Sequence, residues 1–306
     1  MKRLKEFIYE SIDFINEGTS EEKEMKKWLK QNGAKKMKVV NGEVVLVGKT
    51  GTSINELKLQ PDVEELPDFI KFQKEEFSCT LELEGKSLKT LKGFPAPGPA
   101  AHLELYNCTS LKDFDIDLSN TTGGASIELH DCTNLESLSG FKTAKKSSHA
   151  NGLYIYNSPK LKSLKELKDF PDMNLILENV GICDLEGYPT QEKNYTQKIV
   201  IIGAPNLVSL DGYHSKSRPR VIEFRDCPKL SKVGDMSFTK NKEVEFITFI
   251  NCPKVDDAFL EELLELCKIE DDNWGKLQLI NTGVKADSDV IKKFKEKYPS
   301  KQVEVE

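Results

Sequence analysis

Pairs of apolar residues separated by one other residue recur along the chain, as in Leu103/Leu105 and Ile127/Leu129. This alternation is typical of a short β-strand with one buried face. Such a strand is not stable alone, whereas stacked copies pair their backbones and bury their apolar side chains against one another. The spacing therefore predicts a repeat solenoid of about nine rungs over residues 77–285. Its strands are expected to begin, 22 to 30 residues apart, at Leu81, Leu103, Ile127, Leu153, Leu175, Ile199, Ile222, Ile247 and Leu277.

A column of turn-forming residues follows these strands. Glycine, asparagine and aspartate tolerate turn geometry or hydrogen-bond the nearby backbone, which suits the point where the chain leaves the sheet. A small residue usually comes next, and four cysteines at this place, Cys108, Cys132, Cys227 and Cys252, are expected to be buried in the core. The column consists of Gly85, Asn107, Asp131, Asn157, Asn179, Gly203, Asp226, Asn251 and Asn281.

A glycine followed by an aromatic residue recurs in "LKGFP" (91–95), "LSGF" (138–141), "LEGYP" (185–189) and "LDGY" (210–213). The glycine permits a bend, and the ring is expected to fill the return side of the coil. The phrase apolar-x-apolar-x-x-Cys-x-x-Leu resembles the leucine-rich repeat, and the Gly-aromatic tail is similar to loose repeat proteins of large tailed phages and some bacteria. The resemblance implies a helix-poor α/β repeat solenoid, with a leucine-rich-repeat-like parallel β-sheet and loops as return segments.

Both ends of the chain predict caps for this solenoid. Thr19 with Glu22 forms a capping box, and Gly33 ends a helix over residues 20–32. Asn41-Gly42 suits a hairpin over 36–48, so residues 18–76 are expected to form a small α/β N-terminal cap. At the other end, amphipathic helices over 256–267 and 287–299 and an edge strand over 301–306 predict a helical C-terminal cap, assigned to residues 286–306.

Composition excludes several classes of function. The chain has 306 residues, of which 38 % are hydrophobic, and a net charge of -6, which argues against nucleic acid as the main ligand. No apolar run is long enough for a membrane span, and Glu6, Glu10 and Asp13 interrupt any signal-peptide core, so we expect neither membrane attachment nor secretion. Seven cysteines without a C-x-x-C pair indicate a reducing, cytoplasmic environment.

Catalytic chemistry is not indicated. "GKT" at 48–50 lacks the earlier glycine of a phosphate-binding loop, because Glu43 stands at that position. The four histidines show no metal-ligand spacing, although His102 and His130 are expected on neighbouring rungs. We therefore expect no catalytic residues, no metal, no cofactor and no small-molecule substrate.

The residues between the apolar pairs are expected to face outward on the sheet, where repeat proteins usually bind. Early rungs present glutamates and tyrosines and middle rungs present aliphatic residues, a combination typical of a protein-binding surface. The alternative is that β-branched residues serve strand formation and glutamates serve solubility. The candidate binding residues are Glu104, Tyr106, Glu128, His130, Tyr154, Tyr156, Ile176, Val200, Ile202 and Arg225.

The first ten residues, "MKRLKEFIYE", resemble the capsid-targeting leader of internal head proteins in T-even-like phages. The resemblance implies cleavage after a glutamate that follows an aliphatic residue two positions earlier, which fits Glu10 and Glu17. The alternative for residues 1–17 is a short amphipathic helix with Leu4, Ile8, Ile12 and Ile15 on one side.

Together these features predict a non-enzymatic module that binds a protein partner through its sheet face. The resemblances imply a phage-encoded protein located in the host cytoplasm or packaged in the virion head. The alternative is a structural virion component acting as a spacer or decoration, and an enzyme with an unrecognised site is a third class.

Overall fold

The computed structural model describes residues 19–35, 37–40, 43–46, 54–67, 71–72, 79–92, 101–118, 125–143, 151–167, 173–188, 198–215, 220–238, 244–267 and 275–306. The predicted leader with Glu10 and Glu17, and the Asn41-Gly42 turn, lie outside these residues.

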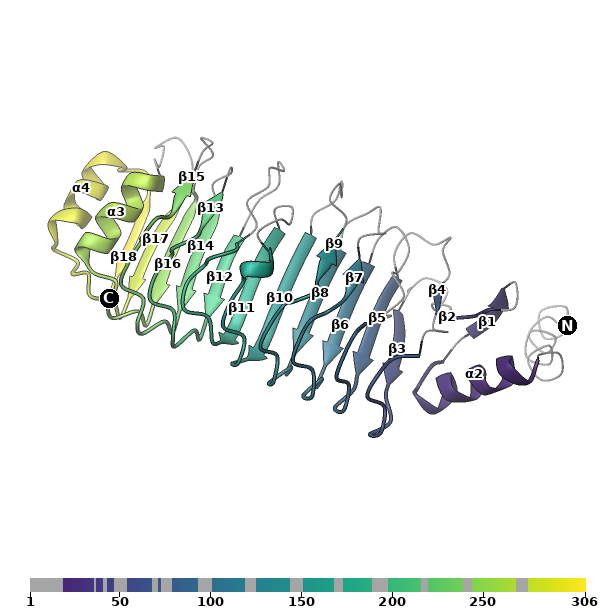
Figure 1. Ribbon diagram of the computed structural model, residues 1–306. Coiled ribbons are helices and arrows are strands. Elements are labelled where there is room, and N and C mark those ends of the chain that lie inside the picture. Colours follow the sequence, from purple (N-terminus) through teal and green to yellow (C-terminus); the bar gives the residue numbers. More distant parts are fainter. Residues whose placement is uncertain are drawn as a thin grey trace, which may run out of the picture.

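One parallel sheet of eleven strands runs the length of the molecule, and successive strands lie side by side (Figure 1). The predicted repeat solenoid with few helices and a helical C-terminal cap is therefore confirmed. In order, the strands are β3 (Ile54–Lys58), β5 (Cys79–Glu84), β6 (Ala101–Tyr106), β8 (Ala125–His130), β10 (Asn151–Ser158), β11 (Met173–Val180), β12 (Lys198–Ile202), β14 (Val221–Arg225), β16 (Phe246–Ile250), β17 (Lys276–Ile280) and β18 (Gln302–Val305).

The predicted register is also confirmed. Each expected strand start pairs with the next, from Leu81↔Leu103 at one end to Ile247↔Leu277 at the other. Two further strands extend the sheet beyond these nine rungs. β18 is the predicted edge strand, whereas β3 was not expected, because Asn55 occupies the place that an aliphatic residue takes in the other rungs.

The turn column has the backbone conformation that its residue types indicate. Seven asparagines and aspartates of the column have φ between 53° and 57°, and Gly203 has φ 65°. Many of these side chains also form hydrogen bonds with the side chain of the next rung. The Asn157 amide donates to Asp131 at 2.6 Å, and the Asn179 amide donates to Asn157 at 2.6 Å. The same contact joins Asn251 to Asp226 and Asn281 to Asn251. An in-register ladder of polar side chains therefore lines this edge of the coil.

The interior of the coil is built from the apolar pairs, the small residues and the return aromatics. Cys108, Cys132, Cys227 and Cys252 are buried, as predicted. The rings of Tyr188 and Tyr213 are fully buried, with centroids 4.4 Å apart. Gly187 has φ 93°, and a Cβ there would lie 2.3 Å from a backbone oxygen of the preceding rung, which explains the glycine of the Gly-aromatic phrase.

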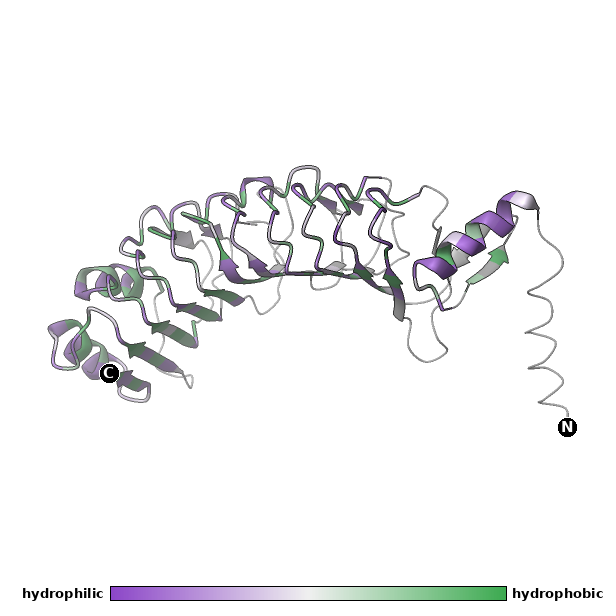
Figure 2. Ribbon diagram, turned by 90° about the horizontal axis from the view of Figure 1, so that it is seen from below, coloured by the Kyte–Doolittle hydropathy of each residue, from purple (hydrophilic) through white to green (hydrophobic). Residues whose placement is uncertain are grey.

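The described return segments are mostly loops, as expected. They include one short 3₁₀ helix, η1 (Lys165–Leu167), and two pairs of two-residue strands. In one pair β7 (Asp117–Leu118) lies beside β9 (Lys142–Thr143), and in the other β13 (His214–Ser215) lies beside β15 (Ser237–Phe238). The sheet lines the inner side of an arch and the return segments form its outer side (Figure 2). Outward-facing residues of the strands therefore share one concave face.

The ends carry the predicted elements. At the N-terminal end, α2 (Ser20–Gln31) is capped by the Thr19 hydroxyl, which accepts from the Glu22 backbone N–H, and Gly33 follows it with φ 87°. The hairpin of β1 (Met37–Val40) and β2 (Glu43–Leu46) is joined by β4 (Lys71–Phe72) in a separate small sheet. At the other end, α3 (Asp257–Cys267) and α4 (Asp289–Lys297) pack beside the last strands (Figure 1).

Candidate functional site

The concave face is formed by alternate residues of every strand, so its side chains stand in columns across the sheet. All ten candidate binding residues lie on it, and all are half-buried, while the apolar pairs with which they alternate are buried. One column runs Glu56, Glu82, Glu104, Glu128, Tyr154, Ile176, Val200, Glu223, Thr248, Gln278 and Glu304. The second runs Lys58, Glu84, Tyr106, His130, Tyr156, Glu178, Ile202, Arg225, Ile250 and Ile280.

Three rings of the second column form a continuous stack over β6, β8 and β10. The His130 ring lies between Tyr106 and Tyr156, with centroid distances of 4.7 Å on both sides and interplanar angles of 11° and 14°. In-register parallel strands bring these side chains side by side, because each strand contributes one ring at the same position. The sequence predicts this column, and the stacked orientation of the rings comes from the structure.

Tyr154 completes the aromatic part of the face from the first column. Its ring lies over Gly152 on the same strand, where a Cβ would come within 2.4 Å of the ring. Burial, with a smaller contribution from Glu128, raises the pKa of Tyr154. A glycine at position 152 therefore leaves the space that the Tyr154 ring occupies.

Two histidines lie among the glutamates of this face, and one of them, His102, contacts glutamates of two neighbouring strands. The His102 Nε2 atom lies 2.7 Å from Glu104 Oε1 and 3.8 Å from Glu128 Oε1, while His130 Nε2 lies 3.5 Å from Glu128 Oε2. The expectation that His102 and His130 occupy neighbouring rungs is confirmed. His102 was not among the candidate binding residues, although its position two residues before Glu104 places both side chains on one face.

Glutamates dominate the first four strands of the face. The pKa of Glu82 is raised by burial and then by the charges of Glu104 and Glu56. The Tyr106 hydroxyl donates to Glu104 Oε2 at 2.5 Å, and this hydrogen bond, together with burial, raises the pKa of Tyr106 well above its usual value. Among the described residues, no group of three or more acidic, histidine or cysteine side chains is arranged to hold a metal ion.

The face becomes aliphatic over β11 and β12, where Ile176, Val200 and Ile202 are half-buried. On β14 the Arg225 guanidinium lies 2.5 Å from Glu223 of the same strand. Along the arch, the residues of the face are thus first acidic, then aromatic, then aliphatic, and on β14 they form an ion pair within one strand.

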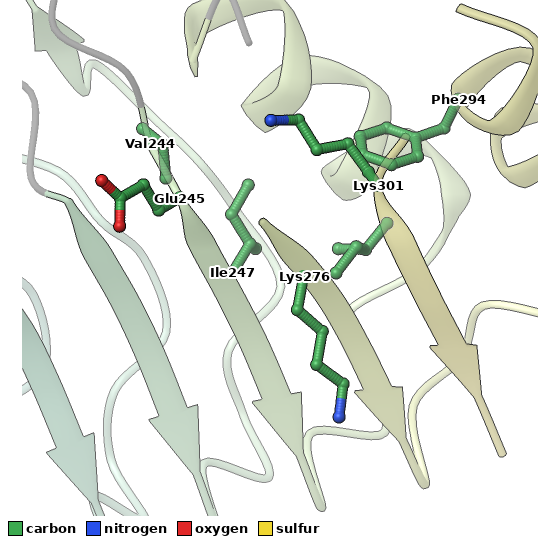
Figure 3. A pocket seen from close by; sticks show the side chains of 7 residues that line it. Val244, Glu245, Ile247, Lys276, Phe294 and Lys301 are labelled. Atoms are coloured by element: carbon green, nitrogen blue, oxygen red, sulfur yellow. The ribbon is translucent and has the colours of Figure 1, made fainter. Parts of the chain in front are cut away.

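Two pockets in the described part of the chain lie away from the concave face. Figure 3 shows a pocket where β16 and β17 begin, close to α4, with a void of about 10 Å³, the space of about one water molecule. It is lined by Val244, Glu245, Ile247, Lys276, Leu277, Phe294 and Lys301. A wider hollow, open to solvent, lies beside α2 and is lined by Trp28, Asp62, Val63, Glu64, Glu65, Leu66, Pro67 and Lys92. The first is too small for a metabolite, and the second is open to solvent. The concave face is the candidate site because of the side chains that its strands bring together.

No protein-family model, curated protein or solved structure matches the chain. Of the helices in the described part of the chain, none has the length and apolar character needed to cross a bilayer. The functional proposal therefore rests on the fold, a parallel-sheet solenoid, and on the side chains of its concave face.

Proposed function

We propose that this protein is a binding module that holds a protein partner on the concave sheet face through non-covalent contacts. The observation that carries the proposal is the contiguous row of half-buried tyrosines, glutamates and aliphatic side chains on β6 to β12. Protein interfaces typically have aromatic anchor residues in an apolar centre that is surrounded by a polar rim.

The curvature supports the same proposal. A face on the inner side of an arch can contact a partner from several strands at once (Figure 2). Two of the three tyrosine anchors, Tyr154 and Tyr156, stand on one strand near the middle of this face, with acidic strands on one side and aliphatic strands on the other.

The experiment is capture of a partner from lysate of the source cells by the immobilised protein and by a variant with Tyr106→Ala, Tyr154→Ala and Tyr156→Ala. The matched control carries three alanines at exposed positions outside the sheet face, at Lys162, Glu166 and Val208. We expect one protein to be lost from the tyrosine variant alone, with both variants melting close to the unmodified protein. Equal capture by all three proteins would overturn the choice of face, and no specific capture would favour the structural spacer.

We further propose, on the resemblance of the first ten residues alone, that the chain is head cargo cleaved after Glu10 or Glu17. The intact mass of the protein from its native source tests this separately: a chain beginning at Ser11 or Gly18 is expected, and an uncleaved chain would refute it. The proposal of a binding face does not depend on this result.

A further inference from the structure

The row of glutamates at the start of the concave face is unusual for a parallel sheet. Glu56, Glu82, Glu104 and Glu128 pair in register across β3, β5, β6 and β8, and adjacent strands are about 4.8 Å apart. Glu56 has a lysine partner, Lys35, at 2.5 Å. In the described part of the chain, no lysine or arginine forms an ion pair with the other three.

Like charges directly opposite one another on neighbouring strands destabilise a sheet. Burial is the largest cause of the raised pKa of Glu82, the charges of Glu104 and Glu56 add to it, and Lys35 and His102 oppose it only in part. The row therefore opposes folding, and a positive partner would reverse the sign of its contribution. Histidine contacts at Glu104 and Glu128 do not supply the permanent charge that a lysine or arginine would.

The aromatic stack adds a place for a cation at its open end. On one side the stack ends at Tyr106, next to Glu84, which Lys58 already neutralises at 2.8 Å. On the other side it ends at Tyr156, next to the exposed Glu178 of β11. A lysine or arginine side chain over this end of Tyr156 would contact both the ring face and the Glu178 carboxylate.

The aliphatic part of the face gives the partner its second feature. Ile176, Val200 and Ile202 lie on β11 and β12, and from β8 to β12 there are three strand spacings, about 14 Å. An extended peptide crosses this distance in about four residues. A simple polycation would use the glutamates and leave these isoleucine and valine side chains uncovered.

We propose that the segment bound on the concave face is a peptide with a basic run over Glu82, Glu104, Glu128 and Tyr156, followed after a short spacer by aliphatic residues over Ile176, Val200 and Ile202. This inference rests on the proposed function and names the chemistry of the partner. The peptide crosses the strands, along the direction of the arch. Complementarity of charge at one end and apolar contact at the other fix its register.

The test is fluorescence anisotropy with labelled synthetic peptides and the full-length protein, at peptide concentrations up to about 1 mM. The probes are a basic run, a glycine spacer of about one or two residues, which matches the single strand spacing of about 4.8 Å between β10 and β11, and an aliphatic run, synthesised in both chain directions. Comparison peptides replace the basic run by glutamates or the aliphatic run by serines. We expect a basic-aliphatic peptide to bind best and its affinity to fall with added salt.

The decisive variant carries Glu82→Gln and Glu128→Gln, and Glu166→Gln in the return helix η1 is the matched control. We expect about tenfold weaker peptide binding for the double variant and no change for the control. Because the substitutions remove repulsion, the urea midpoint of the double variant should be equal or higher, so weaker binding cannot be attributed to unfolding.

Three results would overturn the inference: equal binding of the acidic peptide, equal binding of the peptide without aliphatic residues, or no loss in the glutamate variant. Absence of binding by every peptide would also overturn it. If a partner is then still captured through the tyrosines, the proposed function stands and only the chemistry assigned to the partner is wrong. If capture fails as well, the binding face itself is wrong.

Discussion

The asparagine ladder permits a test that separates backbone conformation from side-chain hydrogen bonding. Asn157 has φ 56°, donates to Asp131 and accepts from Asn179, both at 2.6 Å. Asn157→Ala removes the two hydrogen bonds and forces a Cβ without a polar group into the left-handed region. Asn157→Gly removes the same hydrogen bonds but tolerates that backbone conformation.

The expected magnitudes follow from these contacts. Each hydrogen bond is solvent-exposed and contributes about 0.5 kcal/mol, near the lower limit for such bonds. The left-handed backbone adds about 1 kcal/mol for alanine. We therefore expect Asn157→Ala to lower the free energy of unfolding by about 2 kcal/mol, and Asn157→Gly to lower it by about 1 to 1.5 kcal/mol, including the greater freedom of its unfolded chain.

The assay is urea unfolding followed by far-UV circular dichroism, with hydrogen exchange of β8, β10 and β11 to detect local opening. Asn134 is the matched control, because its amide donates to the Thr109 carbonyl while its φ is not positive. There the order should reverse, with glycine more destabilising than alanine. If alanine at position 157 is as stable as glycine, the left-handed turn column is not a determinant of this fold.

Three further predictions concern the same architecture. Gly203→Asn should raise the free energy of unfolding by about 0.5 kcal/mol, because a less free unfolded chain and a hydrogen bond in the gap of the ladder outweigh the strain of a side chain at φ 65°, a conformation that asparagine adopts elsewhere in the column; a lower urea midpoint would contradict this. Leu129→Asp should abolish cooperative unfolding, since Leu129 is 0 % exposed within the apolar core, where a charge is costly; a normal melting curve would refute the register. The folded-state pKa of Glu82 is raised, so the unmodified protein gains stability as the pH falls through that pKa. In urea titrations, Glu82→Gln should therefore stabilise the protein more near pH 7 than near pH 5. A difference in stability that does not change with pH would exclude charge repulsion as the cause of the stabilisation.

The backbone of the solenoid is predictable from the sequence because each rung repeats the same short sequence pattern. An apolar pair, a turn residue and a small residue specify strand, left-handed turn and buried column, and the structure has all three at Leu103, Asn107 and Cys108. The same rule fails for β3, where Asn55 interrupts the alternation although Leu57 is buried. That strand is held by pairing with its neighbour, which a single segment of sequence does not reveal.

Contacts on the concave face were predictable only in part. Register alone puts Tyr106, His130 and Tyr156 on neighbouring strands, but their parallel stacking depends on side-chain rotamers. The contact of His102 with both Glu104 and Glu128 depends likewise on how a side chain crosses from one strand to the next. Return segments of unequal length hide such neighbours in the sequence, because residues in contact are separated by a different number of positions in each rung.

In an in-register parallel sheet, like residues of successive rungs lie side by side, and for most residue types this contact is stabilising. Asparagines bond along the turn column, and aromatic rings stack, as Phe224 and Phe249 do with centroids 5.6 Å apart. Charged residues are the exception, because a stack of one sign accumulates repulsion. Glu82, Glu104 and Glu128 thus depart from the rule that the rest of the coil obeys, and such local departures are expected where function rather than stability determines the residue.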